Sequence, residues 1–182
     1  MELLENGVVR LKGEIWMKLG VNLTREQVLK TPDRHDDNLI VDICSELIAQ
    51  WAFTSIIVNV AEHIPGIVSL AVGTGGSGWD IQNPPAETSD LQFLYSELYR
   101  KPITSKTYVD NSGNPVLTKT NKIEFTTMFD FSEANGPIVE MGLFGGANAL
   151  LENNGTRVNA KHFPVLNKTA ASQLTLMWKL VF

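Results

Sequence analysis

The sequence contains a single cysteine, Cys44, among its 182 residues. One thiol can form neither an internal disulfide nor a zinc site built from cysteines. Cys44 lies within an apolar stretch of helical periodicity, so we expect it to be a small buried core residue. A catalytic thiol is the less favoured alternative. The chain is long enough to bury a hydrophobic core without such cross-links.

Charged side chains are also scarce, at 19% of the residues, and the formal net charge is −5. The sequence has no run rich in Lys and Arg. Because a nucleic-acid binder needs a cationic face to neutralise phosphates, the composition argues against nucleic acid as a partner. The low charge favours a protein that buries much of its surface in an assembly.

Uninterrupted apolar runs of membrane-spanning length are missing as well. The most apolar segment, LIVDICSELIAQWAFTSIIVNV, is interrupted by Asp42, Glu46 and Gln50, whereas a span needs roughly 18–20 predominantly apolar residues. The N-terminus lacks the cationic and apolar regions of a signal peptide. We therefore expect a soluble protein in which this segment is a deeply buried helix.

Residues 1–65 are predicted to form a mostly helical region. Thr24 and Gln27 have the spacing of a capping box at the start of a short helix, TREQVLK. This helix is expected to end before Pro32. A second helix is predicted after the loop TPDRHDDN, capped by Asp36, Asp37 or Asn38. Its apolar face would consist of Leu39, Ile40, Ile43, Leu47, Ile48 and Trp51.

Residues 66–182 are predicted to form a β domain, because apolar and polar side chains alternate there. Turn-forming sequences separate the segments, and no helix of crossover length lies between them, so antiparallel pairing is expected. The predicted fold class is α+β: N-terminal helices followed by an antiparallel β-sandwich, Ig-like or jelly-roll-like, or a small barrel. Strands are predicted at 67–73, 100–109, 121–131, 138–146, 158–166 and 172–182, and one or two helical turns at 90–99.

The segment AVGTGGSGWD, residues 71–80, has the G-x-G-x-x-G spacing of a dinucleotide-binding turn. In such a turn the phosphates lie at the N-terminus of the helix that follows the glycines. Here the segment continues into WDIQNPPAETSD, where Pro84 and Pro85 prevent a helix from starting at Gly78. We therefore expect a glycine-rich loop that leaves a strand, and we predict no cofactor.

The histidines suggest no metal site. His35 has Asp33, Asp36 and Asp37 as neighbours, but an acidic loop before a helix is ordinary capping. His162 is expected to be a packed or surface residue of a strand. We therefore predict no metal-binding residues.

The sequence gives equally little support for catalytic residues. Ser77 lacks the G-x-S-x-G spacing of a nucleophile elbow. Glu133 and Glu140 are carboxylates that could serve acid–base chemistry, but nothing in the sequence selects them. The sequence therefore predicts no catalytic residues and a protein that is not an enzyme.

Four segments in the second part of the chain, and the order in which they occur, form a recognisable arrangement. They are A-x-G-T-G (71–75), L-x-x-E-x-x-R (Leu94, Glu97, Arg100), E-A-N-G-x-I-x-E-x-G-L-F (133–144) and K-T-A-x-x-x-L-T-L-x-W (168–178). With these segments the chain resembles a group of virion structural proteins of tailed bacteriophages. Similar chains occur in phage-tail-like contractile injection systems. The resemblance covers residues 66–182 and does not extend to residues 1–65.

The resemblance implies a non-enzymatic structural subunit of a particle, located in the virion and assembled in the bacterial host cytoplasm. A place in the tail, baseplate or neck is favoured over a head-decoration role. The implied partners are other particle proteins and copies of the chain itself, and not nucleic acid, a membrane or a small-molecule substrate.

Aromatic side chains in loops are the candidate contact residues, because aromatics are enriched at interface hot spots. They are Trp79, Tyr95 and Tyr99. Packing inside the sandwich is the alternative role for each of them.

Two other functions remain as alternatives. A carbohydrate- or receptor-binding β-module would need exposed aromatic residues beside polar ones in a groove. An enzyme would need the glycine loop to bind a nucleotide.

Overall fold

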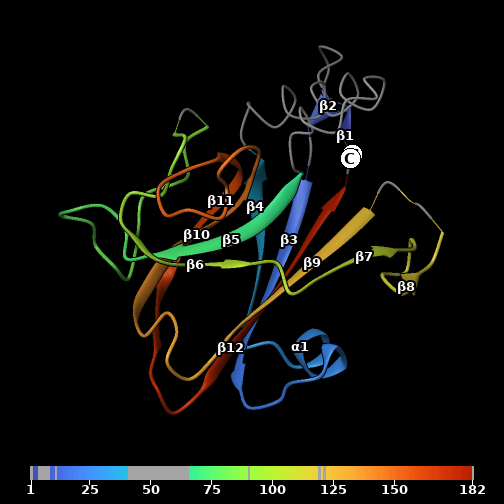
Figure 1. Cartoon of the computed structure of the whole chain (residues 1–182), viewed down its shortest axis with the longest axis horizontal. Helices are drawn as coiled ribbons and strands as arrows, with labels where there is room; N and C mark the ends of the chain where they lie inside the picture. The colour runs from blue at the N-terminus through green and yellow to red at the C-terminus, as the bar shows by residue number, and fades with distance from the viewer. Residues whose placement is uncertain are drawn as a thin grey trace. The chain divides into compact units, whose positions relative to one another are not determined.

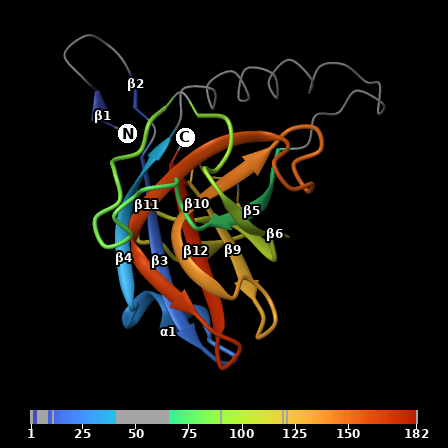
Figure 2. The same cartoon turned by 90° about the vertical axis from the view of Figure 1, so that its left-hand side faces the viewer.

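The computed structural model describes residues 2–3, 9–10, 12–40, 66–89, 91–118, 120 and 122–181. These residues form mostly antiparallel β-structure with one short helix, α1 (Arg25–Lys30) (Figures 1 and 2). The chain divides into two compact units. Unit 1 consists of Met1–Ile40, Ile103–Asn135 and Lys168–Phe182, and unit 2 of Val41–Pro102 and Gly136–Asn167.

Unit 1 contains most of the strands. Two short ones, β1 (Glu2–Leu3) and β2 (Val9–Arg10), pair with each other. The others are β3 (Lys12–Gly20), β4 (Arg34–Ile40), β7 (Ser105–Val109), β8 (Pro115–Val116), β9 (Lys122–Phe129) and β12 (Gln173–Val181). They lie in the order β4-β3-β12-β9-β7-β8, and each neighbouring pair is antiparallel.

Strand β12 holds the centre of this sheet, between β3 and β9. Trp178 lies opposite Ile15 on one side and Phe125 on the other, and all three are buried. Leu174, Leu176, Trp178 and Leu180 are fully buried, which confirms the apolar face predicted from their alternation. On the other face, Val28 of α1 packs with Trp16 and Met177.

Helix α1 begins with the predicted capping box. Gln27 N donates to Thr24 Oγ1 at 3.3 Å, and Thr24 N donates to Gln27 Oε1 at 2.8 Å. Arg25 then fastens the helix to β9: its Nε and Nη2 donate to the two carboxylate oxygens of Glu124 at 2.8 and 2.9 Å. Local capping and one half-buried ion pair therefore fix a helix that is too short to be stable alone.

Replacing the cap residue tests this account. We expect Thr24→Ala to lower the free energy of unfolding by about 1 kcal/mol, because the N–H of Gln27 loses its acceptor. Thr24→Ser is the matched control and should keep near wild-type stability, since the hydroxyl remains. Urea denaturation measures both; equal stability of the alanine and serine variants would contradict the prediction.

The described residues of unit 2 form four strands: β5 (Ile67–Gly73), β6 (Glu97–Pro102), β10 (Gly136–Gly145) and β11 (Thr156–Lys168), whose last residue belongs to unit 1. Their order is β6-β5-β10-β11. β5 pairs antiparallel with both β6 and β10. A small apolar cluster of Ala71, Leu94, Phe144 and Ala149 packs beside these strands.

The predicted helical character of the N-terminal region is wrong where the structure describes it, apart from α1. Residues 12–20 and 34–40 are strands β3 and β4. Asp36 and Asp37, predicted as caps, lie in β4 opposite Ile15 and Glu14. β3 pairs with β12, and β4 pairs with β3. These pairings outweigh the local capping signal, because they give the backbone N–H and C=O groups of β3 and β4 hydrogen-bond partners along the strands.

Several predictions fall on residues outside the described ranges. They are the second helix from residue 41 onward, the domain boundary at residue 65, and the environment of Cys44. Within the described part of the chain, no helix is long and apolar enough to cross a membrane.

In the second half of the chain, the predicted strands at 67–73, 121–131, 138–146, 158–166 and 172–182 correspond to β5, β9, β10, β11 and β12. The segment 100–109 is divided between β6 and β7. The helical turns predicted at 90–99 are wrong, because residues 91–96 form bends and β6 begins at Glu97.

Candidate functional site: the glycine loop and its aromatic cluster

The glycine loop leaves the end of β5 within unit 2. Gly73, the last residue of β5, lies opposite Glu140 of β10 and Glu97 of β6. The next residue, Thr74, donates its N–H to Ser96 O at 2.8 Å. The chain then turns back, and Trp79 N donates to Gly76 O at 3.2 Å. The loop is thus an ordered turn between two bonded segments.

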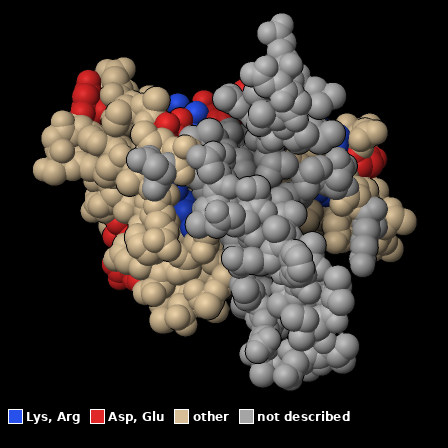
Figure 3. Space-filling view, turned by 90° about the horizontal axis from the view of Figure 1, so that it is seen from above, with Lys and Arg blue, Asp and Glu red and all other residues tan. Residues whose placement is uncertain are grey.

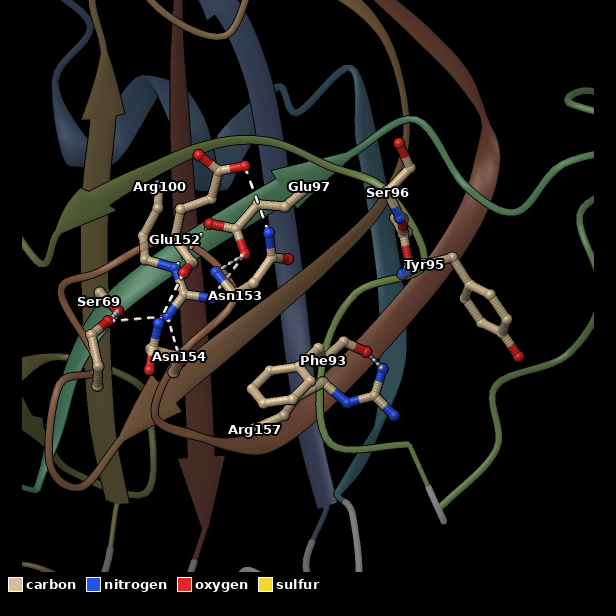
Figure 4. A network of polar contacts seen from close by, with 12 residues as sticks. Ser69, Phe93, Tyr95, Ser96, Glu97, Arg100, Glu152, Asn153, Asn154 and Arg157 are labelled. Atoms are coloured by element: carbon tan, nitrogen blue, oxygen red, sulfur yellow. Dashed lines mark hydrogen bonds and ion pairs between the residues drawn. The ribbon is translucent and has the colours of Figure 1, made fainter.

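The carboxylate of Glu140 lies under this loop and is completely buried. Its Oε1 accepts hydrogen bonds from Gly75 N at 3.1 Å and Ser96 N at 2.9 Å, and its Oε2 accepts from Tyr95 N at 3.0 Å. Such charge-assisted bonds are stronger than neutral ones. Glu140 therefore ties the glycine loop to the segment that leads into β6, where Figure 4 shows Tyr95 and Ser96.

Packing explains why the positions of Gly73 and Gly75, the first two glycines of the motif, require glycine. A Cβ on Gly73 would lie 2.5 Å from both Glu140 Oε1 and Ser96 O. Gly75 has a φ of +80°, and a Cβ there would lie 2.6 Å from the Trp79 ring. The glycines are needed because a carboxylate and an indole occupy the space beside the backbone.

Trp79 and Tyr95, two of the predicted contact residues, lie together in an aromatic cluster with His162. The ring centroids of Trp79 and Tyr95 are 4.6 Å apart in an edge-on arrangement, and Trp79 and His162 are also 4.6 Å apart. Trp79 is half-buried, whereas 45% of the Tyr95 surface is exposed. Tyr99 has a different place: it is half-buried in β6 opposite Val72. Whether any of the three contacts a partner stays a prediction.

His162 is the third member of the cluster, and the sequence did not predict it as a contact residue. It was expected to be either packed or on the surface, and it is buried. Its Nδ1 lies 2.9 Å from Pro85 O. Because a carbonyl oxygen can only accept, Nδ1 is the donor. The backbone N–H of His162 donates to Glu87 Oε1 at 2.7 Å, and Val165 N donates to Ile81 O at 2.8 Å. These bonds fasten the long loop after Trp79 to β11.

A second buried polar network holds the loop between β10 and β11 (Figure 4). Arg100 Nε and Nη2 donate to the two carboxylate oxygens of Glu97 at 2.8 and 2.7 Å, and both side chains are almost fully buried. Arg100 Nη1 donates to Ala149 O at 2.9 Å and Asn154 O at 2.7 Å. The guanidinium also lies 3.9 Å from the centroid of the Phe144 ring. The Glu and Arg of the L-x-x-E-x-x-R segment therefore position a loop.

The acidic segment around His35 has structural contacts of its own in unit 1. His35 stacks on Trp16 with ring centroids 4.4 Å apart. Asp36 pairs with Arg34, and Asp33 Oδ2 accepts from Leu19 N at 2.7 Å.

Unit 1 also contains a cavity of about 470 Å³ that the sequence did not indicate. Lys179 of β12 borders it, with Nζ 4.3 Å from the Trp16 ring centroid and 3.9 Å from Glu124 Oε2. Burial lowers the pKa of Lys179, although the charge of Glu124 acts in the opposite direction. Other lining side chains include Glu14, Asp37, Asp110 and Lys122.

The surface charges of the described residues are dispersed on the face that Figure 3 shows. Lys and Arg side chains and Asp and Glu side chains lie there in small separate groups on a mainly uncharged surface.

Models of known protein families match no part of the chain, and a search of curated proteins finds no similar sequence.

Proposed function

We propose that this protein is a non-enzymatic structural subunit of a bacteriophage or phage-tail-like particle, built as an Ig-like or jelly-roll-like β-sandwich. It acts through protein–protein contacts in the tail, baseplate or neck. The mostly antiparallel β-structure and the segments resembling virion proteins support this proposal. Two of those segments supply Glu140 and the Glu97–Arg100 pair, which hold loops in place.

The observation that carries the proposal is the presentation of Tyr95. The residue is 45% exposed, yet its backbone N–H is bound to Glu140 and its ring contacts Trp79 and His162. A fixed aromatic side chain loses little conformational entropy when a partner covers it. Exposed, pre-organised tyrosines are therefore well suited to be interface hot spots.

The glycine loop supports a structural role over nucleotide binding. A phosphate group would need free backbone N–H groups at the loop. The N–H of Gly75 already donates to the Glu140 carboxylate, whose negative charge would repel a phosphate. Trp79 packs against Gly75 and Gly76 from the other side.

Incorporation into particles tests the proposal. We expect Tyr95→Ala to reduce incorporation or self-association by roughly 30-fold, the effect of losing a hot spot worth about 2 kcal/mol. Tyr95→Phe is the matched control and should stay near wild type, because the ring is kept. Quantitative mass spectrometry of purified particles and sedimentation velocity of the isolated chain measure the two effects.

A chain that stays strictly monomeric and enters no tail, neck or capsid particle would contradict the proposal. The neighbourhood of the gene gives an independent check, since adjacent sheath, baseplate or capsid genes are expected. Copies bound only to the head would favour a capsid decoration protein. Binding to a glycan array that Tyr95→Ala abolishes would favour a carbohydrate- or receptor-binding module.

A further inference from the structure

Lys168, at the end of β11, is a buried lysine in unit 1. Only 2% of its surface is exposed. Its Nζ donates to Asp130 O at 2.8 Å and to Asn135 Oδ1 at 3.0 Å. Both partners belong to the turn between β9 and β10, so Lys168 joins two turns that lie far apart in the sequence.

The environment of Lys168 favours a neutral amine more than an ordinary surface site does. Burial lowers its pKa, while the charges of Glu133 and Asp130 act in the opposite direction. An amine must be neutral to act as a nucleophile, and burial is one way in which proteins activate lysine.

Asn135 presents its carboxamide to this amine in a fixed orientation. Its Oδ1 accepts from Lys168, and its Nδ2 donates to Phe131 O at 2.8 Å. Since a C=O bond is about 1.2 Å long, Asn135 Cγ lies within about 4.2 Å of Lys168 Nζ. Reacting atoms in near-attack geometries are about 3–3.5 Å apart, so a small movement of Lys168 Nζ toward Cγ, or a rotation about the Asn135 Cα–Cβ bond, brings the pair within range.

We propose that Lys168 and Asn135 form an intramolecular amide cross-link. Lys168 Nζ attacks Asn135 Cγ; the Nζ–Cγ bond forms, the Cγ–Nδ2 bond breaks, and ammonia leaves. One proton moves from the amine to the departing nitrogen, so the reaction needs no oxidant, reductant or other reactant. Asn135 is exposed on its outer side, so the ammonia can escape to solvent.

Glu133, which lies in the same turn as Asn135, is the proton carrier in the proposed reaction. Its Oε2 accepts from Asp130 N at 2.8 Å, which holds it in the same turn as Asn135, and its charge acts on Lys168. A carboxylate can take the proton of the amine and return it to the leaving nitrogen. The reaction involves this chain alone and does not depend on the proposed function.

The mass of the folded full-length protein tests the cross-link. We expect the intact mass to fall below the sequence mass by one ammonia, and proteolysis to yield one linked peptide pair containing Asn135 and Lys168. A protein that keeps its full mass after long incubation, with both side chains recovered unlinked, would overturn the proposal.

Variants separate the cross-link from other losses of ammonia. Lys168→Arg keeps a cation but should retain the full mass, as should Asn135→Ala. Lys30→Arg is the matched control at an exposed lysine and should still lose ammonia. Succinimide formation at Asn6–Gly7, Asn135–Gly136 or Asn154–Gly155 also releases ammonia, but it would persist in Lys168→Arg, and that outcome would count against the cross-link.

The role of Glu133 is tested by rate. Glu133→Gln should slow cross-linking by on the order of 100-fold, followed as the change in intact mass with time, while circular dichroism confirms an unchanged fold. Glu133→Asp should restore part of the rate. An unchanged rate in Glu133→Gln would exclude Glu133 as the proton carrier.

Discussion

Glu140→Ala is expected to lower the free energy of unfolding by about 3–5 kcal/mol, because three backbone N–H groups lose a charged acceptor. The carboxylate is completely buried, so bulk water has no direct access to replace it. The effect should be concentrated in unit 2, where the glycine loop and the segment before β6 would separate from each other.

Denaturation and amide hydrogen exchange measure this effect. Exchange should accelerate at Gly75, Tyr95 and Ser96 before it does in the strands. Glu140→Gln should cost less, because one acceptor oxygen remains while the new amide group faces a donor. Glu152→Ala removes an exposed carboxylate and is the matched control. Equal losses in Glu140→Ala and Glu152→Ala would show that the buried carboxylate does not hold the loop.

Arg100→Ala is the second change with a large expected effect, a loss of about 3–5 kcal/mol in the free energy of unfolding. Removing one partner of a buried ion pair leaves the other charge uncompensated. Glu97 would be that charge, with a side chain that is 0% exposed. The variant would also remove the hydrogen bonds to Ala149 O and Asn154 O. It would leave a cavity beside the Phe144 ring, where the guanidinium now lies.

The conservative replacement distinguishes charge from geometry. Arg100→Lys keeps the charge but cannot make the paired bonds to Glu97, so we expect it to recover only part of the loss. Lys30→Ala breaks an exposed ion pair and serves as the control, with a loss of about 0.5 kcal/mol or less. Chemical denaturation gives the free energies, and exchange at residues 149–154 reports the loop. If Arg100→Lys were as stable as the wild type, the paired geometry would be unimportant.

The strands of the second half of the chain could be predicted because their burial pattern is local. In β12, Leu174, Leu176, Trp178 and Leu180 share one buried face, and the sequence shows their alternation directly, although Thr175 and Met177 on the other face are buried as well. Strands β3 and β4 could not be found in the same way. β3 pairs with residues 173–181 at the other end of the sequence, and such pairing leaves little local signal. In β4, DRHDDN resembles a helix cap, but pairing with β3 determines its conformation.

Only the aromatic residues that lie in loops could be predicted as members of the candidate site. Trp79 and Tyr95 were predicted as contact residues because they are aromatic residues in loops, and the structure brings them together. The groups that organise them come from distant positions: Glu140 is 65 residues from Gly75, and His162 lies on β11. Glu97 and Arg100 could be noticed in the sequence as part of the L-x-x-E-x-x-R segment, but their buried ion pair was not predicted.

The central position of β12 has a consequence for the order of events during synthesis. β3 is made early, but the partner for one of its edges is residues 173–181, which leave the ribosome much later. Until then β3 and β9 lack the strand that separates them in the sheet. Both pairings of β12 therefore join segments far apart in the sequence, which predicts slow folding, with the edges of β3 and β9 open to wrong partners until β12 is added.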